Sequence, residues 1–200
     1  MGLVFFYVDG HNLYHGAGEG RRWLSLPLLA SLILGKLGGE LEVAKIHYFT
    51  SEYSTKGKAG PKQQTYLRVL AQHKPLVEVH LGRFEPKKRT CNSCNHEQTR
   101  PEEKETDVSI GCQMLHDVYN NKHFHTAVLL SGDGDFVPAI RFVDKAKKRA
   151  VVLNPRGKNY WRFQEIAPES FPLLPEMYDE CLLPDRVKDG EGFLVRPKEW

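Results

Sequence analysis

The sequence has no long apolar run, and this absence sets the first limits on what the protein can be. None of its 200 residues lies in a stretch near the roughly 18 apolar residues that a membrane-spanning helix needs. The opening residues, MGLVFFYVDG, are apolar only briefly and show neither a basic leader nor a cleavage site, so we expect no signal peptide. We therefore predict a soluble, cytoplasmic protein without a membrane partner.

The sequence also has few cysteines and only a small net charge. Four cysteines are too few for a disulfide scaffold, and a formal net charge of +3 permits a nucleic-acid partner without requiring one. The apolar share of 40% and the charged share of 26% are typical of a globular protein, and the length suits one domain. Because the sequence turns polar after about residue 183, we predict a domain over residues 1–183 and a loosely packed tail over 184–200.

Hydrophobic periodicity predicts strands that alternate with helices. Short apolar runs typical of buried strands occur at five places, namely residues 3–9, 43–49, 76–84, 125–131 and 149–154. Helical patterns occur between them, at residues 25–37, 61–73, 105–121 and 135–148. This alternation predicts βαβ units and a mainly parallel sheet.

Two of these helices carry more specific signals. The helix at 25–37 has Ser25 as its N-cap and ends at Gly38 and Gly39. The helix at 105–121 shows an apolar stripe at helical spacing, formed by Val108, Cys112, Leu115 and Tyr119.

Residues 85–103 follow neither period and are rich in charge, so we interpret them as an inserted loop or hairpin. They contain TCNSCNH, the only C-x-x-C of the chain. Cys91 and Cys94 would be half of a zinc site, with His96 as a third ligand and His80 or another subunit's residue as a fourth. A structural Zn²⁺ knuckle, free thiols on a loop and redox chemistry remain open.

Three aspartates follow predicted strands directly. Asp9 ends the first strand, and Asp133 and Asp135 follow the fourth in the stretch LLSGDGDFVPAI. Sites in open α/β sheets form at the carboxyl ends of strands, so these acids converge if the two strands are neighbours. Carboxylates this close repel one another unless a cation neutralises them, and oxygen-only ligands suit Mg²⁺ or Mn²⁺.

A fourth acid, Asp107, opens the helix at 105–121, and Gly111 one turn later would allow close packing. Each acid also has a structural interpretation. Asp135 would N-cap the following helix, Asp9 would form a strand-to-loop turn, and Asp107 would be a favourable first-turn acid.

Three motifs, VDGHNLYHG, EEKETDVSIGCQML and LLSGDGDFVPAI, occur in an order that resembles the NYN-domain proteins, the LabA-like branch of the PIN-like nuclease superfamily. The resemblance covers about residues 3–180. It implies a PIN-like Rossmannoid three-layer α/β sandwich with strand order 3-2-1-4-5. It also implies a metal-dependent ribonuclease site, whose motif residues are here Asp9, Asn12, Asp107, Asp133 and Asp135.

The chemistry implied is in-line hydrolysis of an RNA phosphodiester by a metal-activated water. Asp9 and Asp133 are the first metal-ligand candidates, and Asp107 and Asp135 would act through water. Asn12 and Ser131 would orient the phosphate or a bound water, although a turn or cap role for Asn12 remains open.

Basic loop residues are candidates for binding the substrate. In NPRGKNYWRF, which follows the last predicted strand, Arg156 and Lys158 would contact phosphates of single-stranded or structured RNA. Tyr160 or Trp161 would stack a base, or Trp161 would instead pack into the core at a helix start.

A catalytically weak or inactive NYN-type RNA-binding or regulatory module is the alternative to a ribonuclease, and a homodimer remains open. A phosphohydrolase of the haloacid dehalogenase class also uses strand-end aspartates. It needs a second acid two residues after its nucleophile, where this chain has His11.

Overall fold

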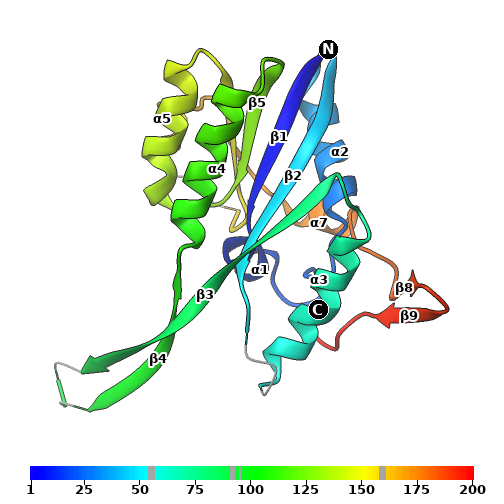
Figure 1. The fold of residues 1–200 in the computed structure, drawn as a ribbon, viewed down its shortest axis with the longest axis vertical. Helices are drawn as coiled ribbons and strands as arrows, with labels where there is room; N and C mark the ends of the chain where they lie inside the picture. The colour runs from blue at the N-terminus through cyan, green and yellow to red at the C-terminus, as the bar shows by residue number, and fades with distance from the viewer. Residues whose placement is uncertain (54–56, 91–92, 95, 158–160) are drawn as a thin grey trace.

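A central sheet with helices on both faces organises the chain (Figure 1). The computed structural model describes residues 1–200 except 54–56, 91–92, 95 and 158–160, and only the backbone of residues 89, 100, 161 and 162. The described strands are β1 (Gly2–Asp9), β2 (Leu41–Ser51), β3 (Val77–Thr90), β4 (Glu97–Lys104), β5 (Phe124–Leu130), β6 (Arg149–Asn154), β7 (Phe171–Pro172), β8 (Arg186–Asp189) and β9 (Gly192–Val195). The described helices are α1 (Gly10–Ala17), α2 (Leu26–Leu37), α3 (Ala59–Ala71), α4 (Thr106–Asn120), the 3₁₀ helix η1 (Gly134–Phe136), α5 (Val137–Lys145), α6 (Trp161–Gln164) and α7 (Pro175–Asp179). None of these helices has both the length and the apolar character needed to cross a membrane.

The main sheet confirms the predicted strand order. Its order over the described residues is β4-β3-β2-β1-β5-β6-β7, and the five strands expected from the sequence are β3-β2-β1-β5-β6, all parallel. The expected count of five is too small, because β4 adds an antiparallel strand at one edge and the two-residue β7 adds a parallel strand at the other. β1 and β5 are neighbours, as the convergence of the strand-end acids requires.

The alternation of side chains along β1 divides the core into two layers. Val4, Phe6 and Val8 pack into a cluster with α2 and α3, whereas Phe5 and Tyr7 pack into a cluster with α4 and α5. Figure 1 shows these helix pairs on opposite sides of the sheet, which gives the predicted three layers. Successive strand side chains point to opposite faces, so the same alternation turns the side chain of Asp9 toward the α4 face.

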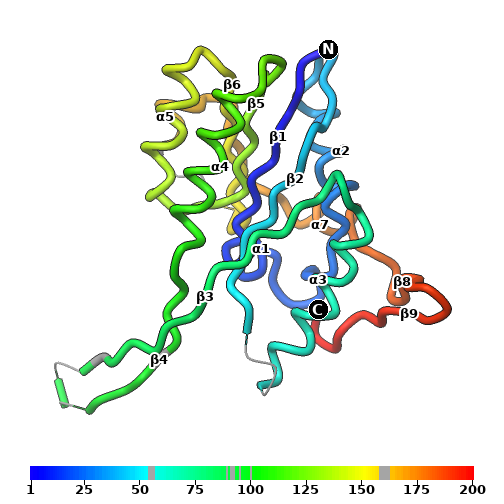
Figure 2. Tube along the Cα trace, viewed as in Figure 1, coloured from blue at the N-terminus to red at the C-terminus, as the bar shows by residue number. Residues whose placement is uncertain are grey.

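The inserted segment is a hairpin over its described residues, which was one of the two predicted forms. β3 continues past the sheet and pairs with β4 from Arg83 opposite Lys104 to Thr90 opposite Glu97. The tube in Figure 2 shows this hairpin leaving the body of the molecule. Its strands lack an apolar period because they project away from the core and carry exposed ion pairs instead.

The expected apolar stripe of α4 is not its buried face. Val108 is 71% exposed and Tyr119 66% exposed, while Ile110 and Met114 are fully buried against the sheet. Both sets recur at helical spacing, so periodicity alone does not distinguish them. The N-cap prediction for α2 is confirmed, because the Ser25 side chain accepts a hydrogen bond from the Leu28 backbone at 3.3 Å.

The C-terminal segment is packed, and the expectation of a loose tail over 184–200 is wrong. β8 and β9 form a second hairpin, and Leu194 and Trp200 are only 5% and 6% exposed. The Trp200 ring contacts Tyr66, with 5.5 Å between ring centroids. These two apolar side chains anchor a segment whose remaining polar residues suggested disorder.

Candidate functional site

Asp9 lies at the carboxyl end of β1, and its carboxylate is fixed on both sides. Oδ1 accepts a hydrogen bond from the Asn12 backbone at 2.8 Å and so caps α1, and Oδ2 accepts one from Ser131 Oγ at 2.8 Å. The side chain is only 5% exposed, and this burial raises the pKa of Asp9 although both hydrogen bonds lower it. Asp9 is therefore the N-cap of α1 and not the predicted strand-to-loop turn residue, and this structural role is compatible with a role as a ligand.

The loop after β5 places the next two aspartates differently from the expectation. Asp133 Oδ1 accepts a hydrogen bond from the Asp135 backbone at 3.0 Å, so Asp133 caps the 3₁₀ helix and Asp135 does not act as the N-cap. Asp133 is partly buried, and Asp135 is exposed.

Asn12 connects the first and third motifs. Its side-chain Oδ1 accepts a hydrogen bond from the Gly132 backbone at 3.2 Å, which joins the start of α1 to the loop after β5. Gly132 has no room for a side chain, because a Cβ there would lie 2.5 Å from Asn154 Oδ1. A larger residue at this position would therefore displace the Asn154 side chain.

Asp107 shows most directly that the predicted acids share one site. Its pKa is raised from 3.8 to about 6, first by burial and then by the charges of Asp9, Asp133, Glu103 and Asp135. Like charges act this strongly only at short range in a partly buried setting. Folding therefore brings four acids from three separate motifs into one electrostatic neighbourhood at the carboxyl edge of the sheet.

Glu103 is a fifth acid of this site, and sequence reasoning did not select it. It lies on β4 and accepts a hydrogen bond from Thr106 Oγ1 at 2.8 Å. Its charge raises the pKa of both Asp9 and Asp107. In the sequence, Glu103 is one of several acids in the run EEKE, so nothing local distinguishes it. The register of β3 with β4 turns Glu103 toward the site. The preceding acid, Glu102, instead forms an ion pair with Lys87 at 2.7 Å.

The donor set fits a hard divalent cation. All five groups offer carboxylate oxygens, and the repulsion that raises the pKa of Asp107 would be relieved by a cation. The acids are spaced more widely than a fully formed three-ligand site, because no three of them have ligand atoms all within 4.8 Å of one another. Among the described residues, only His47, Glu78 and His80 are that close together. This spacing is compatible with Mg²⁺, which uses one or two carboxylates and completes its shell with water and phosphate oxygens.

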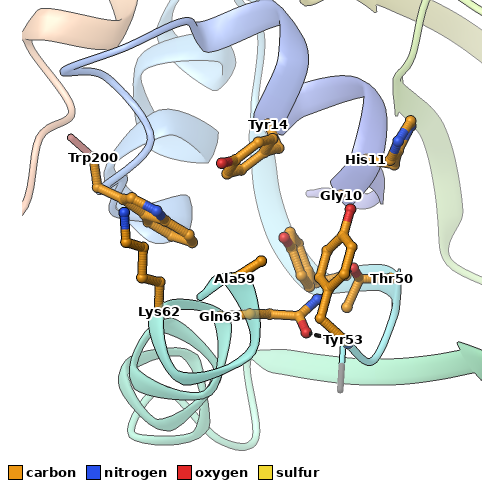
Figure 3. A pocket seen from close by; sticks show the side chains of 10 residues that line it. Gly10, His11, Tyr14, Thr50, Tyr53, Ala59, Lys62, Gln63 and Trp200 are labelled. Carbon is orange, nitrogen blue, oxygen red and sulfur yellow. Dashed lines mark hydrogen bonds between the residues drawn. The ribbon is translucent and has the colours of Figure 1, made fainter. Parts of the chain in front are cut away.

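A pocket lined with aromatic side chains lies next to the acids (Figure 3). It is small, with a cavity volume of about 60 Å³, and is lined by Gly10, Tyr14, Tyr48, Tyr53, Gln63 and Trp200, among others. Burial and the charges of Asp9 and Glu103 raise the pKa of Tyr48, which places that side chain between the pocket and the acids. Neither a motif nor periodicity indicated this pocket, because its rings come from α1, β2, the segment after β2 and the C-terminal segment.

The predicted substrate-binding residues are only partly described. Arg156 is exposed. Burial first, and then the charges of His11 and Arg156, lower the pKa of His15 on α1, so Arg156 lies near the helix that Asp9 caps. Lys158, Tyr160 and the side chain of Trp161 lie outside the described residues.

Of the predicted zinc ligands, the described residues Cys94 and His80 lie far apart. Cys94 is an exposed free cysteine near the hairpin tip, and Cys91 lies outside the described residues. His80 lies ten residues before the end of β3, on the order of 30 Å from the tip along an extended strand. Its ring instead faces His47, with 2.9 Å between His80 Nε2 and His47 Nδ1.

Comparisons with known proteins agree with this architecture. The chain is 25% identical to 6-hydroxy-3-succinoylpyridine 3-monooxygenase HspA from Pseudomonas putida, over 97% of this chain and 74% of that protein. The crystal structure of a protein of unknown function from Vibrio parahaemolyticus superposes with a TM-score of 0.60 at 20% identity, covering 91% of this chain and 96% of that one. The family model of the NYN domain matches residues 4–174, and this chain therefore belongs to the NYN domain family, part of the PIN-like nuclease superfamily.

Proposed function

We propose that the protein is a metal-dependent ribonuclease that hydrolyses phosphodiester bonds of single-stranded or structured RNA. The observation that carries this proposal is the convergence of Asp9, Asp107, Asp133 and Asp135, expressed in the raised pKa of Asp107. Membership of a nuclease superfamily supports it. Mg²⁺ or Mn²⁺, when bound, would neutralise the scissile phosphate and acidify the attacking water.

The residues of the site would have different roles, either binding the metal ion or positioning the acids. Asp9 and Asp133 would hold the ion, because both carboxylates are already oriented by backbone or hydroxyl donors. Asp107 and Asp135 would act through water. Ser131 and Asn12 would keep the ends of β1 and β5 in register, so that the acids remain in place when substrate binds.

The substrate would be held on both sides of these acids. Arg156 and Lys158 would neutralise backbone phosphates, as basic side chains do in most nucleic-acid complexes. Tyr14 and Tyr53, the partly exposed rings of the pocket beside Gly10, would stack on an unstacked base next to the scissile phosphate.

A cleavage assay tests the proposal. End-labelled single-stranded RNA is incubated with purified protein in Mn²⁺, in Mg²⁺ and in EDTA, and products are separated on a gel. We expect divalent-dependent cleavage by the wild type and a loss of at least about 100-fold in Asp133→Asn and Asp9→Asn, because a metal ligand contributes several kcal/mol to the transition state. Asp144→Asn, an exposed aspartate on α5, is the matched control and should retain full activity.

Two results would redirect the proposal. Tight RNA binding without cleavage in any divalent ion would favour the alternative, an RNA-binding or regulatory module. Equal cleavage by the wild type and Asp133→Asn would exclude this site as the source of the activity.

Monooxygenation of a pyridine ring is a second candidate, because the Pseudomonas relative is named as a 6-hydroxy-3-succinoylpyridine 3-monooxygenase. The observation that favours it in this chain is the group of His47, Glu78 and His80, since two histidines and one carboxylate are the ligand set of non-haem iron oxygenases. The check is oxygen consumption with 6-hydroxy-3-succinoylpyridine, Fe²⁺ and a reductant such as NADH. Consumption that depends on the pyridine would support this candidate, and its absence would remove it.

A further inference from the structure

Two neighbouring strands present three metal-ligating side chains on one face of the sheet, apart from the acids. His47 on β2 pairs with Glu78 on β3, and His80 follows two residues later on the same strand. Residues two apart on a strand project to the same face, so Glu78 and His80 both lie beside His47. His47 belongs to the α4 face, because its ring stacks on that of Tyr7, with 5.5 Å between centroids.

The buried carboxylate of Asp117 contacts His47 on the side of the ring opposite His80. The ring is 3% exposed, and its Nε2 lies 3.1 Å from Asp117 Oδ2 on α4, although the contact lacks the alignment of a regular hydrogen bond. Asp117 also accepts hydrogen bonds from the Tyr7 hydroxyl at 2.9 Å and from Gln113 Nε2 at 2.9 Å. A proton on His47 Nε2 would face the Asp117 carboxylate, and Nδ1 would then keep a lone pair available to a ligand.

That lone pair points to the other two side chains. His47 Nδ1 lies 2.9 Å from His80 Nε2 and 3.9 Å from Glu78 Oε2, and ligand atoms of all three residues lie within 4.8 Å of one another. Two nitrogens bound to one tetrahedral ion are about 3.4 Å apart at metal–nitrogen distances of about 2.05 Å. The two rings would therefore have to separate by only about 0.5 Å to admit an ion.

The surroundings favour an accessible but ordered site. The His80 ring stacks on Phe49, with centroids 4.4 Å apart and an interplanar angle of 13°, which fixes one ligand. Glu78 is half exposed and forms a contact of 3.6 Å with Lys45, so the third ligand can rotate and an ion can enter from solvent. On α4 itself, Asp107 and Asp117 are ten residues apart, roughly 15 Å along the helix, which separates this group from the acid site.

We propose that His47, Glu78 and His80 bind one divalent transition-metal ion of the Fe²⁺, Co²⁺ and Zn²⁺ group, with Asp117 as the outer carboxylate that orients His47. Two imidazoles and one carboxylate prefer these borderline ions to Mg²⁺, and three protein ligands leave a position for water or another small ligand. The carboxylate–histidine–metal arrangement is the usual support of a metal-bound histidine. Binding requires His80 to carry its proton on Nδ1 in place of Nε2, which shifts a proton within the ring and releases none.

The competing interpretation is a simple hydrogen bond between the two rings, and metal titration separates the two. Cys91→Ser with Cys94→Ser serves as the parent protein, so that thiols of the hairpin do not contribute. Zn²⁺ is titrated by calorimetry, and Co²⁺ by visible absorption, which is intense for tetrahedral and five-coordinate sites. We expect one ion per chain in the parent in excess Mg²⁺, which occupies the acid site.

Variants of the surface ligands identify the site. Glu78→Gln and His80→Asn should each weaken Zn²⁺ binding by more than about 100-fold, since removing an outer-shell partner alone costs about 10- to 100-fold. Asp117→Asn should weaken Zn²⁺ binding by about 10- to 100-fold, provided that its circular dichroism spectrum matches that of the parent. His123→Asn, an exposed histidine before β5, and Asp133→Asn in the acid site are the controls and should bind as the parent does.

The outcomes are distinguishable from those of the ribonuclease assay. Failure of the parent to bind Zn²⁺ and Co²⁺, or equal affinity in the parent and His80→Asn, would overturn the metal site whatever the RNA result. Loss of Zn²⁺ binding in Glu78→Gln with intact binding in Asp133→Asn would support it even if no RNA is cleaved.

Discussion

Ser131 Oγ donates a hydrogen bond of 2.8 Å to Asp9 Oδ2 across 122 positions of the chain. The same oxygen accepts a hydrogen bond from the Asp133 backbone at 3.1 Å. A hydroxyl that both donates and accepts has little rotational freedom, and Ser131 is fully buried. One side chain therefore connects the ends of β1 and β5 and orients two acids before any ion binds.

Removing the Asp107 charge should stabilise the protein at neutral pH. The pKa of Asp107 is raised from 3.8 to about 6, so between these values the folded protein holds a proton that the unfolded chain releases, and stability falls as pH rises. Above about pH 6 Asp107 is ionised in the folded protein too, and the loss of stability caused by its raised pKa is complete. We expect Asp107→Asn to melt at a higher temperature than the wild type at about pH 7.5 in EDTA, and at nearly the same temperature at about pH 4.

Thermal melts followed by circular dichroism measure this difference, and Mn²⁺ should reduce it in the wild type by neutralising the site. Asp144→Asn is the exposed control and should show no pH-dependent gain. A melting temperature of Asp107→Asn below that of the wild type at neutral pH would show that Asp107 is not repelled by its neighbours.

RNA binding should respond to salt in a way that identifies Arg156 as a phosphate contact. With Ca²⁺ to prevent turnover, the slope of log affinity against log salt should become shallower by about 0.7 in Arg156→Gln, the amount expected for one contact on a single strand. Lys122→Gln is the control. Lys122 precedes β5 and so lies at the amino end of that strand, whereas the acids lie at the carboxyl ends of the strands. Fluorescence anisotropy over a salt series gives both slopes.

The divalent ion should affect RNA affinity independently of the basic residues. Without it, the acids of the site would repel the scissile phosphate, so affinity should fall in EDTA although no cation of the protein has changed. Affinity that is insensitive to salt and to divalent ions would argue against a phosphate as the ligand of this site.

Trp200 should contribute to the stability of the whole domain. Its ring is 6% exposed and contacts Trp23, Tyr14 and Tyr66, so Trp200→Ala should cost about 3–5 kcal/mol in the free energy of unfolding. Val195→Ala, in the same segment but 57% exposed, should change it by less than about 0.5 kcal/mol. Urea denaturation measures both, and a similar small change in the two variants would mean that the segment is not part of the core.

Two glycines should respond to alanine with opposite signs. A Cβ at Gly111 in α4 would only touch Ala139 Cβ at 4.0 Å, so Gly111→Ala should stabilise by about 0.5–1 kcal/mol through helix propensity. A Cβ at Gly10 would lie 2.6 Å from the Phe49 carbonyl oxygen, so Gly10→Ala should destabilise. Denaturant midpoints measure both. Stabilisation by Gly10→Ala would contradict the close contact of α1 with β2.

The sequence alone determined the features that depend on local patterns. Buried parallel strands are continuous apolar runs, so the five central strands were visible as such, and the cap of α2 was visible in Ser25 and the glycines after it. Three of the acids were found because they follow strands directly and Asp107 because it opens a helix, and the three motifs together indicated the family. Their placement at one edge needed only the neighbouring positions of β1 and β5.

Tertiary structure decided everything that depends on which distant segments meet. The register of β3 with β4 selects Glu103 among several adjacent acids, and the pairing of β2 with β3 places His80 beside His47 instead of beside the cysteines. The packing of α4 buries Ile110 and exposes Val108, although both fit a helical period. Trp200 is fixed by rings from three other segments, so composition alone could not show that its segment is ordered. Long-range contacts of this kind leave no periodic signal in the chain, because burial and charge at one residue depend on neighbours that are distant in the sequence.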